Sequence, residues 1–502
     1  MKNIIKILSF LMFFICIGTQ ISYADDLPSN GISVEIPAGF KVDESHHNIF
    51  TLFYREDGTK IHIYNQDVSK DGVESYINYS NKQIQEGKGT VSLTQKNIRT
   101  LPNKRKAYEF SYMRPYLTNI QNDQNYYYES NVVFKNEKRV VTIWAKTTEA
   151  HKDEIKQAVD KMAQNIILIP EIKNTYSPGI ASKDVNIKGK DISITIPQGS
   201  MMWGMYHPHR IGEYNYLSNI NPIETQLDHK FEFLMTYSDF NKKIDPEDVK
   251  QIYADNRIMM FTMQPWLNGD RDSNIILPQI IQGDYDSYIR NWAQSLKAVE
   301  NPVFVRFANE MNGDWDPWCA WFFAKDTDLY KEAFKRVKRI FEEEGAYNAL
   351  FVWNPHDRSY PDYKWNNPHL YYPGGEFVDW VGLTGYNNGT SFEGDVWREF
   401  SNIYFPLYNE YMEYYGDKPF MITEFSCNEV GGNKENWIRN GFANFAAMPN
   451  IKMAVWFDKV DMLWQYPIDS SQGSLNAFRE SLQNPYFIKN GINRNNQEKV
   501  QP

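Results

Sequence analysis

Two patterns of apolar residues divide the chain, and each predicts a different architecture. Over residues 27–170, short segments alternate between apolar and polar positions, as in strands that bury one face. Apolar residues recur at helical spacing in 73–85 and in 152–166. The second segment places four apolar side chains on one face: Ile155, Val159, Met162 and Ala163. This region is therefore predicted to be an α+β domain with an antiparallel sheet.

The strands expected in this first region are short and closely spaced. They are 50–54, 60–65, 91–98, 105–112, 126–134 and 139–146, the first two joined as a hairpin around Asp57-Gly58. No residues here have the spacing of a catalytic or metal site. Residues 171–190 are polar, contain Pro178-Gly179 and lack periodicity, which predicts a linker.

Over residues 191–490 the pattern changes to short apolar strands separated by helical stretches. The expected strands are 201–206, 231–237, 258–263, 303–307, 349–353, 377–384, 419–423 and 453–457, with the clearest helices at 285–299 and 328–344. Eight strands in this rhythm predict an α/β fold of the (β/α)8 TIM-barrel type. A doubly wound open sheet is the competing fold, but it usually carries a Gly-rich phosphate loop, which is missing here.

Residues 1–24 have the pattern of an export signal. Lys2 and Lys6 precede an apolar run over 7–17, and Ser22-Tyr23-Ala24 is similar to a small-residue cleavage site. A membrane anchor is the alternative, but a spanning helix needs about 20 apolar residues. We expect cleavage after Ala24, no integral membrane span in the mature protein, and a secreted or extracellular location, with cell-surface association open.

Composition narrows the classes of partner. The formal net charge of −10 disfavours nucleic acid and anionic membranes. Without the signal only Cys319 and Cys427 remain, which excludes a disulfide framework; one disulfide and two free thiols both stay open. The 33 Tyr and 14 Trp fit either a large aromatic core or exposed rings on which sugars stack.

Two glutamates end predicted barrel strands. Glu310 follows the fourth strand and Glu424 ends the seventh. The carboxyl ends of barrel strands carry the catalytic residues of this fold, so both carboxylates are expected in one cleft. Two carboxyl groups about 5–5.5 Å apart suit double displacement at an anomeric carbon, in which one attacks while the other transfers the proton.

The run from Arg306 to Trp315, Arg-Phe-Ala-Asn-Glu-Met-Asn-Gly-Asp-Trp, resembles the acid/base motif of glycoside hydrolase family 26. The resemblance extends from Gly204 to about Trp464, and Thr423-Glu424-Phe425 is a weaker match. It implies that Glu310 is the acid/base, that Glu424 is the nucleophile, and that the substrate is a polysaccharide.

The resemblance also implies roles for several neighbours. Tyr386 is expected to hydrogen-bond the nucleophile, which would lower the nucleophile's pKa, and Arg306 to point towards it. A core Tyr and a structural ion pair are the alternatives. The candidates for sugar contact are Trp456 as the aromatic floor, Trp315 and Trp318 as platforms, and His207, with Trp266 as a weaker candidate.

Asn309 is the point of departure from the family pattern. Mannan-cleaving members typically have His before the acid/base glutamate, whereas an Asn there in the wider clan donates to the 2-hydroxyl of the cleaved sugar. Glucose carries that hydroxyl equatorially and mannose axially. We therefore favour a retaining endo-β-glycanase acting on cellulosic or mixed-linkage β-glucan, with an endo-β-1,4-mannanase as the alternative.

The chemistry needs no metal or organic cofactor, and the His residues lack paired ligand spacing. A carbohydrate-binding or cell-wall protein that uses the barrel as a scaffold is the competing class, but it would most simply have lost one of the two glutamates. Tyr126-Tyr127-Tyr128 offers aromatic material for glycan or cell-wall contact by residues 27–170. We expect instead a structural or positioning role for this domain.

Overall fold

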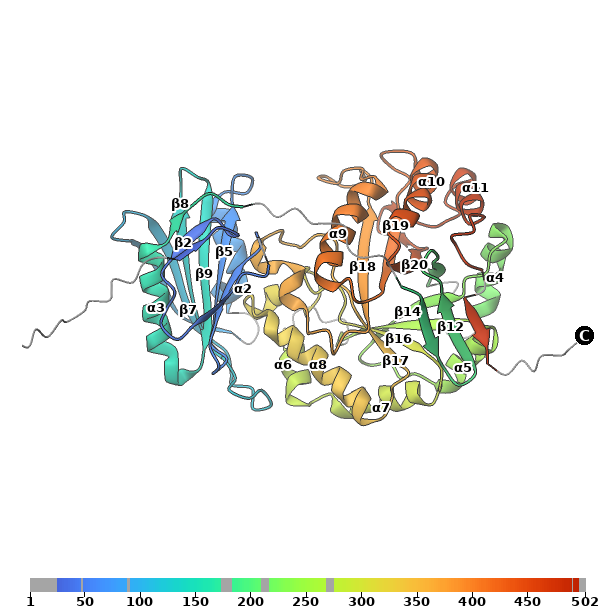
Figure 1. Cartoon of the computed structure of the whole chain (residues 1–502), viewed down its shortest axis with the longest axis horizontal. Helices are drawn as coiled ribbons and strands as arrows, with labels where there is room; N and C mark the ends of the chain where they lie inside the picture. The colour runs from blue at the N-terminus through green and yellow to red at the C-terminus, as the bar shows by residue number, and fades with distance from the viewer. Residues whose placement is uncertain are drawn as a thin grey trace, which may run out of the picture.

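The computed structural model describes residues 25–46, 48–87, 91–172, 183–208, 216–267, 275–489 and 491–495. The predicted signal peptide lies outside the described residues, as do residues 173–182 of the predicted linker. Within these ranges the chain forms an antiparallel N-terminal sheet beside a closed parallel barrel (Figure 1).

The N-terminal region is built on a seven-stranded antiparallel sheet in the order β3-β4-β5-β9-β8-β7-β6. Its strands are β3 (Lys41–Asp43), β4 (Thr51–Tyr54), β5 (Lys60–Asp67), β6 (Ser92–Thr100), β7 (Lys106–Met113), β8 (Tyr126–Phe134) and β9 (Arg139–Thr147). A small sheet joins β1 (Asp25–Leu27), β2 (Ile32–Val34) and β10 (Ile167–Leu168). The predicted α+β fold with an antiparallel sheet is confirmed.

The two faces of this sheet have different coverings. Helix α3 (Lys152–Asn165) lies on the face away from the barrel and buries its four predicted apolar side chains against that face (Figure 1). The opposite face carries Tyr64, Tyr112 and Trp144, which belong to the same continuous hydrophobic core as the barrel. The barrel thus covers one side of the N-terminal sheet.

Two helices, α1 (Val73–Ser80) and α2 (Lys82–Glu86), form where the sequence predicts one. The break falls at Asn81, whose side chain donates to the carbonyl of Ile77 and to the Glu129 carboxylate. A buried side-chain amide that bonds the preceding turn competes with the next backbone hydrogen bond and ends the helix.

The eight parallel barrel strands occur in sequence order around a closed ring. They are β13 (Met202–Tyr206), β14 (Phe233–Asp239), β15 (Ile258–Gln264), β16 (Val303–Phe307), β17 (Ala349–Trp353), β18 (Trp380–Asn387), β19 (Phe420–Cys427) and β20 (Ile451–Phe457). The predicted TIM barrel is confirmed. The strands are mostly apolar and nearly all of their residues are buried, so both the inner and the outer face of the ring are covered.

Helices lie outside this ring. They are α4 (Tyr216–Leu227), α5 (Pro246–Ala254), α6 (Ile276–Gln282), α7 (Asp286–Lys297), α8 (Thr327–Glu343), α9 (Phe400–Tyr415), α10 (Lys434–Asn444) and α11 (Gln472–Ser481). A two-stranded hairpin, β21 (Val460–Asp461) and β22 (Trp464–Gln465), follows the last barrel strand. Within the described ranges, no helix is long and apolar enough to cross a membrane.

A third sheet changes the predicted end of the linker and the predicted end of the barrel domain. Strand β11 (Val185–Lys188) lies inside the predicted linker and pairs with β12 (Ile192–Ile196), which also pairs with β23 (Ile492–Arg494). The linker prediction is wrong for these residues, because Val185 and Ile187 pack against the core. Likewise, β23 extends the barrel region past residue 490.

We predict that both regions unfold in one cooperative transition, because they share one hydrophobic core. Trp365, between β17 and β18, is fully buried and donates from its indole to the Ser80 hydroxyl across the boundary, 2.9 Å away. Trp365→Ala should lower the free energy of unfolding by about 3–5 kcal/mol and shift that single transition. Scanning calorimetry of the full chain measures both. Two transitions, with only the upper or lower one moved by the substitution, would contradict the shared core.

Candidate active site

The carboxyl ends of the barrel strands bring the two predicted glutamates to one rim. Glu310 lies three residues after the end of β16, and Glu424 lies within β19. They are close enough that the negative charge of Glu424 raises the pKa of Glu310. The two predicted catalytic side chains therefore interact.

Glu424 is buried and held by three donors from three different strands. Arg306 of β16 forms an ion pair with its Oε1, and the Tyr237 hydroxyl of β14 donates to the same oxygen. The Tyr386 hydroxyl of β18 donates to Oε2 at 2.5 Å. Burial and the charge of Glu424 raise the pKa of both tyrosines well above the ordinary value, so both stay protonated and donate.

Arg306 is itself fully buried, so its guanidinium needs partners of its own. Its Nε donates to the Thr262 hydroxyl of β15, and Nη1 donates to Oδ1 of Asn354, each at 2.9 Å. The hydroxyl of Thr423 donates to that same Asn354 oxygen at 2.8 Å. Side chains at β15, β17 and β19 thus fix the guanidinium in one orientation towards Glu424.

Glu310 has a different environment. Burial is the largest influence on its pKa, which rises to about 7; Glu424 adds to the rise, and His356 and Arg306 oppose it. A carboxyl group with this pKa is protonated through mildly acidic pH and gives up its proton near neutrality. It can therefore act as an acid in one step and as a base in the next.

The backbone around Glu310 is strained. Ala308 and Glu310 have φ values of 46° and 55°, in the left-handed region that non-glycine residues seldom adopt. The amide of Glu310 donates to the carbonyl of Asn354 at 2.8 Å, and the amide of Ala308 donates to that of Met263 at 3.0 Å. Such strain costs about 1–3 kcal/mol per residue and persists only where the surroundings impose it.

Asn309 lies between Ala308 and Glu310, the two strained residues of this connection. Gln264, at the end of β15, donates to the Asn309 side-chain oxygen at 3.1 Å. This contact occupies the acceptor of the Asn309 amide and directs its NH2 group away from Gln264. The indole of Trp318 donates to the Asn309 carbonyl at 2.7 Å and fixes the backbone there.

Two of the predicted sugar platforms are wrong. Trp456 is fully buried on the outer side of the barrel, where its ring packs against Phe425, Trp437 and Phe478. Trp318 is also fully buried, with its ring edge against Trp266. A ring without an exposed face cannot stack on a sugar.

Trp315 and His207 keep part of their surface exposed. The Trp315 ring lies over Gly313, where a Cβ atom would come within 2.7 Å of the indole, and it contacts His356 and Tyr360 edge-on or tilted. His207 follows β13, with its Nε2 3.7 Å from Oδ2 of the buried Asp458. Trp266 is also half-exposed.

An open polar pocket adjoins Tyr386. Its lining includes His356, Arg358, Tyr360, Asp395 and Arg398. The lining contains both Tyr386, which contacts Glu424, and His356, whose charge lowers the pKa of Glu310, so this pocket lies next to residues that surround the two carboxylates.

Sequence reasoning missed several residues of this site, among them Tyr237, Thr262, Gln264 and Asn354. Each lies at, or one or two residues from, the carboxyl end of a predicted barrel strand. That position was the available signal. The sequence pattern indicates only that Tyr237 ends an apolar strand. In the structure its phenol donates to Glu424 at the mouth of the barrel.

Cys319 and Cys427 are both free and buried. The structure therefore decides between the two alternatives left open by the sequence, in favour of free thiols. Within the described ranges, no group of three or more His, Cys, Asp or Glu side chains has an arrangement that could hold a metal ion.

Comparison with known proteins identifies similar sequences. The sequence model of glycosyl hydrolase family 26 matches residues 279–413. Endoglucanase H of Acetivibrio thermocellus is 30% identical over 263 residues, which cover 51% of this chain and 27% of that protein. A mannan endo-1,4-beta-mannosidase of Bacillus subtilis is 28% identical over 129 residues, which cover 24% of this chain and 34% of that protein. The chain thus spans about a third or less of the length of these relatives.

Among solved structures, a family 26 β-mannanase of Bacteroides ovatus aligns with a TM-score of 0.45 and 15% identity. The alignment covers 58% of this chain and 90% of that one.

We predict that Glu424→Gln lowers the pKa of Glu310 from about 7 towards its ordinary value, because the substitution removes a neighbouring negative charge but keeps the shape. Carboxyl ¹³C shifts of glutamate-labelled protein, followed through a pH titration, measure this. Glu435→Gln, which removes a charge from the surface helix α10, is the control and should leave the Glu310 titration unchanged. An unaltered Glu310 pKa in Glu424→Gln would show that the carboxylates do not interact.

Proposed function

Because the barrel belongs to glycosyl hydrolase family 26, we propose that this chain is a retaining endo-β-glycanase that hydrolyses a β-1,4-linked polysaccharide. One observation carries the proposal: a carboxylate with three fixed donors interacts with a second carboxyl whose pKa is about 7. Retaining glycosidases need such a pair, a nucleophile that stays ionised and an acid that can exchange its proton.

In the first step, a carboxylate oxygen of Glu424 attacks the anomeric carbon. The bond from that carbon to the glycosidic oxygen breaks, and its electron pair goes to the oxygen, which takes the proton of Glu310. The products are a glycosyl ester on Glu424 and a shortened chain with a new hydroxyl group.

In the second step, the Glu310 carboxylate takes a proton from water, and the water oxygen attacks the anomeric carbon. The ester bond to Glu424 breaks, the carboxylate is regenerated, and Glu310 is protonated again. Arg306, Tyr237 and Tyr386 stabilise the negative charge that returns to Glu424.

A β-glucan is the favoured substrate. Gln264 holds the acceptor end of the Asn309 amide, which leaves the NH2 end to donate to an equatorial 2-hydroxyl. Endoglucanase H, the relative that matches over 263 residues, supports the same choice by its name. The similarity to a mannan endo-1,4-beta-mannosidase keeps β-mannan as the alternative.

We expect Glu310→Gln and Glu424→Gln each to lower the hydrolysis of unactivated polysaccharide by at least about 10³-fold, because each removes a group that acts in both steps. Reducing-sugar release measures the loss, and Glu435→Gln is the matched control. On 2,4-dinitrophenyl β-cellobioside, whose leaving group departs without a proton, azide should restore turnover in Glu310→Ala and give a glycosyl azide of β configuration. Near-normal turnover in Glu424→Gln, or an α-azide, would contradict the double displacement.

The substrate is tested on a panel of lichenan, carboxymethylcellulose, β-mannan and xylan, with products separated by size. We expect the highest kcat/KM on lichenan or carboxymethylcellulose, with oligosaccharides appearing first. In Asn309→His the preference should move towards β-mannan, since the amide donor is lost. A wild-type preference for mannan would favour the alternative, and release of monosaccharide alone would contradict endo action.

A further inference from the structure

The connection between β16 and α8, residues 308–326, begins with Asn309-Glu310 and ends against the N-terminal sheet. Three groups of contacts join it to that sheet and its helices. They lie at the middle of the connection, near its end, and at the first residue before α8. All three involve Asn81 or residues of β5, β7, β8, β9 or α1, which precede the connection in sequence by more than 150 residues.

The middle of the connection contacts α1. Tyr79 donates its hydroxyl to the carboxylate of Asp314, four residues after Glu310. Its ring stacks on Trp321, with centroids 5.4 Å apart, and the Trp321 indole donates to the Tyr79 carbonyl at 3.1 Å. Two residues of the connection are therefore fixed by one residue of the N-terminal domain.

Near the end of the connection, Lys325 projects into the N-terminal domain. Its ammonium donates to the carbonyl of Ser80 at 3.0 Å and to the Asn81 side-chain oxygen at 2.8 Å, and forms an ion pair with Glu129 at 2.8 Å. The side chains of Lys325 and Glu129 are both buried. Each of these charges thus has its counter-ion on the other side of the boundary.

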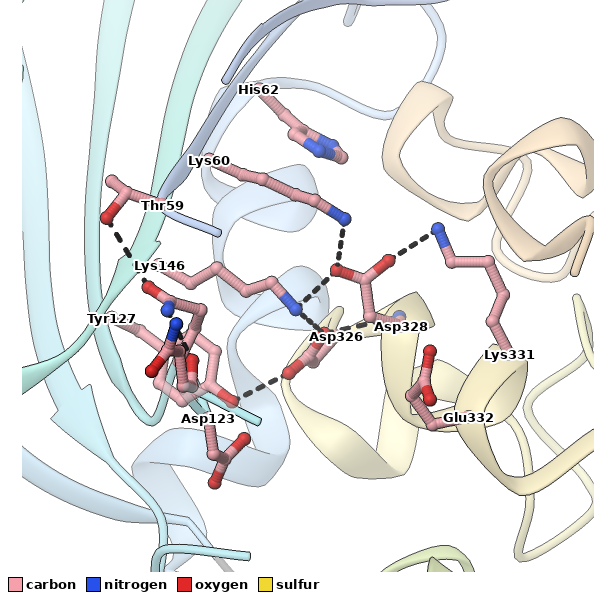
Figure 2. A network of polar contacts seen from close by, with 12 residues as sticks. Thr59, Lys60, His62, Asp123, Tyr127, Lys146, Asp326, Asp328, Lys331 and Glu332 are labelled. Atoms are coloured by element: carbon pink, nitrogen blue, oxygen red, sulfur yellow. Dashed lines mark hydrogen bonds and ion pairs between the residues drawn. The ribbon is translucent and has the colours of Figure 1, made fainter. Parts of the chain in front are cut away.

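Asp326 closes the connection as the N-cap of α8. It accepts from the amide of Asp328 at 3.2 Å, from the Tyr127 hydroxyl at 2.7 Å and from the Lys146 ammonium at 3.0 Å (Figure 2). Lys60 donates to Asp328, two residues further on, at 2.7 Å. The first turn of α8 is therefore tied to strands β5, β8 and β9.

The backbone before this cap is strained. Ala324 and Lys325 have φ values of 53° and 69°. The Tyr112 hydroxyl of β7 donates to the carbonyl of Ala324 at 3.2 Å, so the N-terminal domain contacts the strained peptide directly. A left-handed conformation at non-glycine residues persists where contacts of this kind impose it.

The neighbouring connection between β17 and β18 is supported in the same way. The side chain of Gln66 accepts from the amide of Lys364 at 2.8 Å, and Trp365 donates to Ser80. Asn366 in turn donates to the carbonyl of Asn312 at 2.7 Å, two residues after Glu310. The connection that carries Glu310 and the neighbouring connection therefore both contact the N-terminal domain, each through Ser80 among other residues.

Buried ion pairs cost desolvation and add little net stability, but they fix geometry, because a displaced charge would lose its only compensation. We propose that the N-terminal domain is a positioning part of the active site. Tyr79, Glu129 and Lys146 act through residues 308–326 to hold Glu310 and Asn309 where proton transfer requires them. This inference rests on the proposed function, and it gives the domain a role distinct from glycan capture.

The test uses the full chain with Tyr79→Phe and Lys325→Met. Tyr108→Phe is the control for the first, because Tyr108 also donates to a carboxylate, that of Glu74, but within the N-terminal domain. Lys452→Met is the control for the second, because Lys452 is also buried and donates to two carbonyls, at the opposite end of the barrel. Calorimetry confirms that each variant is folded.

Each variant is assayed on lichenan and on 2,4-dinitrophenyl β-cellobioside, whose leaving group departs without a proton. If the panel selects mannan, β-mannan and 2,4-dinitrophenyl β-mannobioside replace them. A displaced Glu310 should lower kcat/KM on the polysaccharide by roughly tenfold or more. The kcat/KM for the dinitrophenyl glycoside should change by less than about twofold, because this quantity reports the first step, which needs no acid for that leaving group. The two controls should leave both rates unchanged.

Equal losses on both substrates would indicate loss of folded enzyme and would overturn the positioning role, as would rates equal to those of the controls. Should Lys325→Met fail to fold, Tyr79→Phe decides alone. The proposed function is judged separately by Glu310→Gln. If that variant keeps the wild-type rate on polysaccharide, the assignment of the acid fails. If Glu310→Gln is inactive while Tyr79→Phe has the same rates as its control Tyr108→Phe, only the positioning role is contradicted.

Discussion

The Glu424 carboxylate is buried at the mouth of the barrel, and side chains of the surrounding strands must compensate its charge. An ion removed from water needs an opposite charge and hydrogen bonds in fixed places, and Arg306 and the two tyrosine hydroxyls supply them. Arg306 is buried as well, and its guanidinium donates hydrogen bonds to Thr262 and Asn354. Polar residues in or directly after six strands, β14 to β19, are thereby linked by the need to compensate two buried charges.

The same barrel gives its second glutamate a different environment. Glu310 lies on a strained connection, where burial and the charge of Glu424 raise its pKa to about 7. Glu424 receives a cation and two phenols, whereas Glu310 has weaker opposition from His356 and Arg306. Two chemically identical side chains are thus suited to different roles by what surrounds them, which is how sites that need both an acid and a nucleophile are built.

The sequence predicted the barrel well, because a buried parallel strand is apolar along its whole length and leaves a clear signal. It predicted the two glutamates because the strand ends fix the position of polar side chains. It failed for Trp456, because an apolar run does not tell which residues face the barrel interior and which face the helices. Trp456 faces α10 and α11, where it contacts Trp437 and Phe478.

The alternation in the N-terminal strands predicted a buried face but not what covers it. The cover is the barrel itself, so much of the aromatic content that could have served sugar binding lies in the shared core, including Tyr112, Tyr127, Trp144 and Trp365. A boundary drawn at a change of sequence pattern therefore separates two folding patterns without separating two independent structures. Since residues 308–326 end on buried charges of the other region, the environment of Glu310 is determined by both.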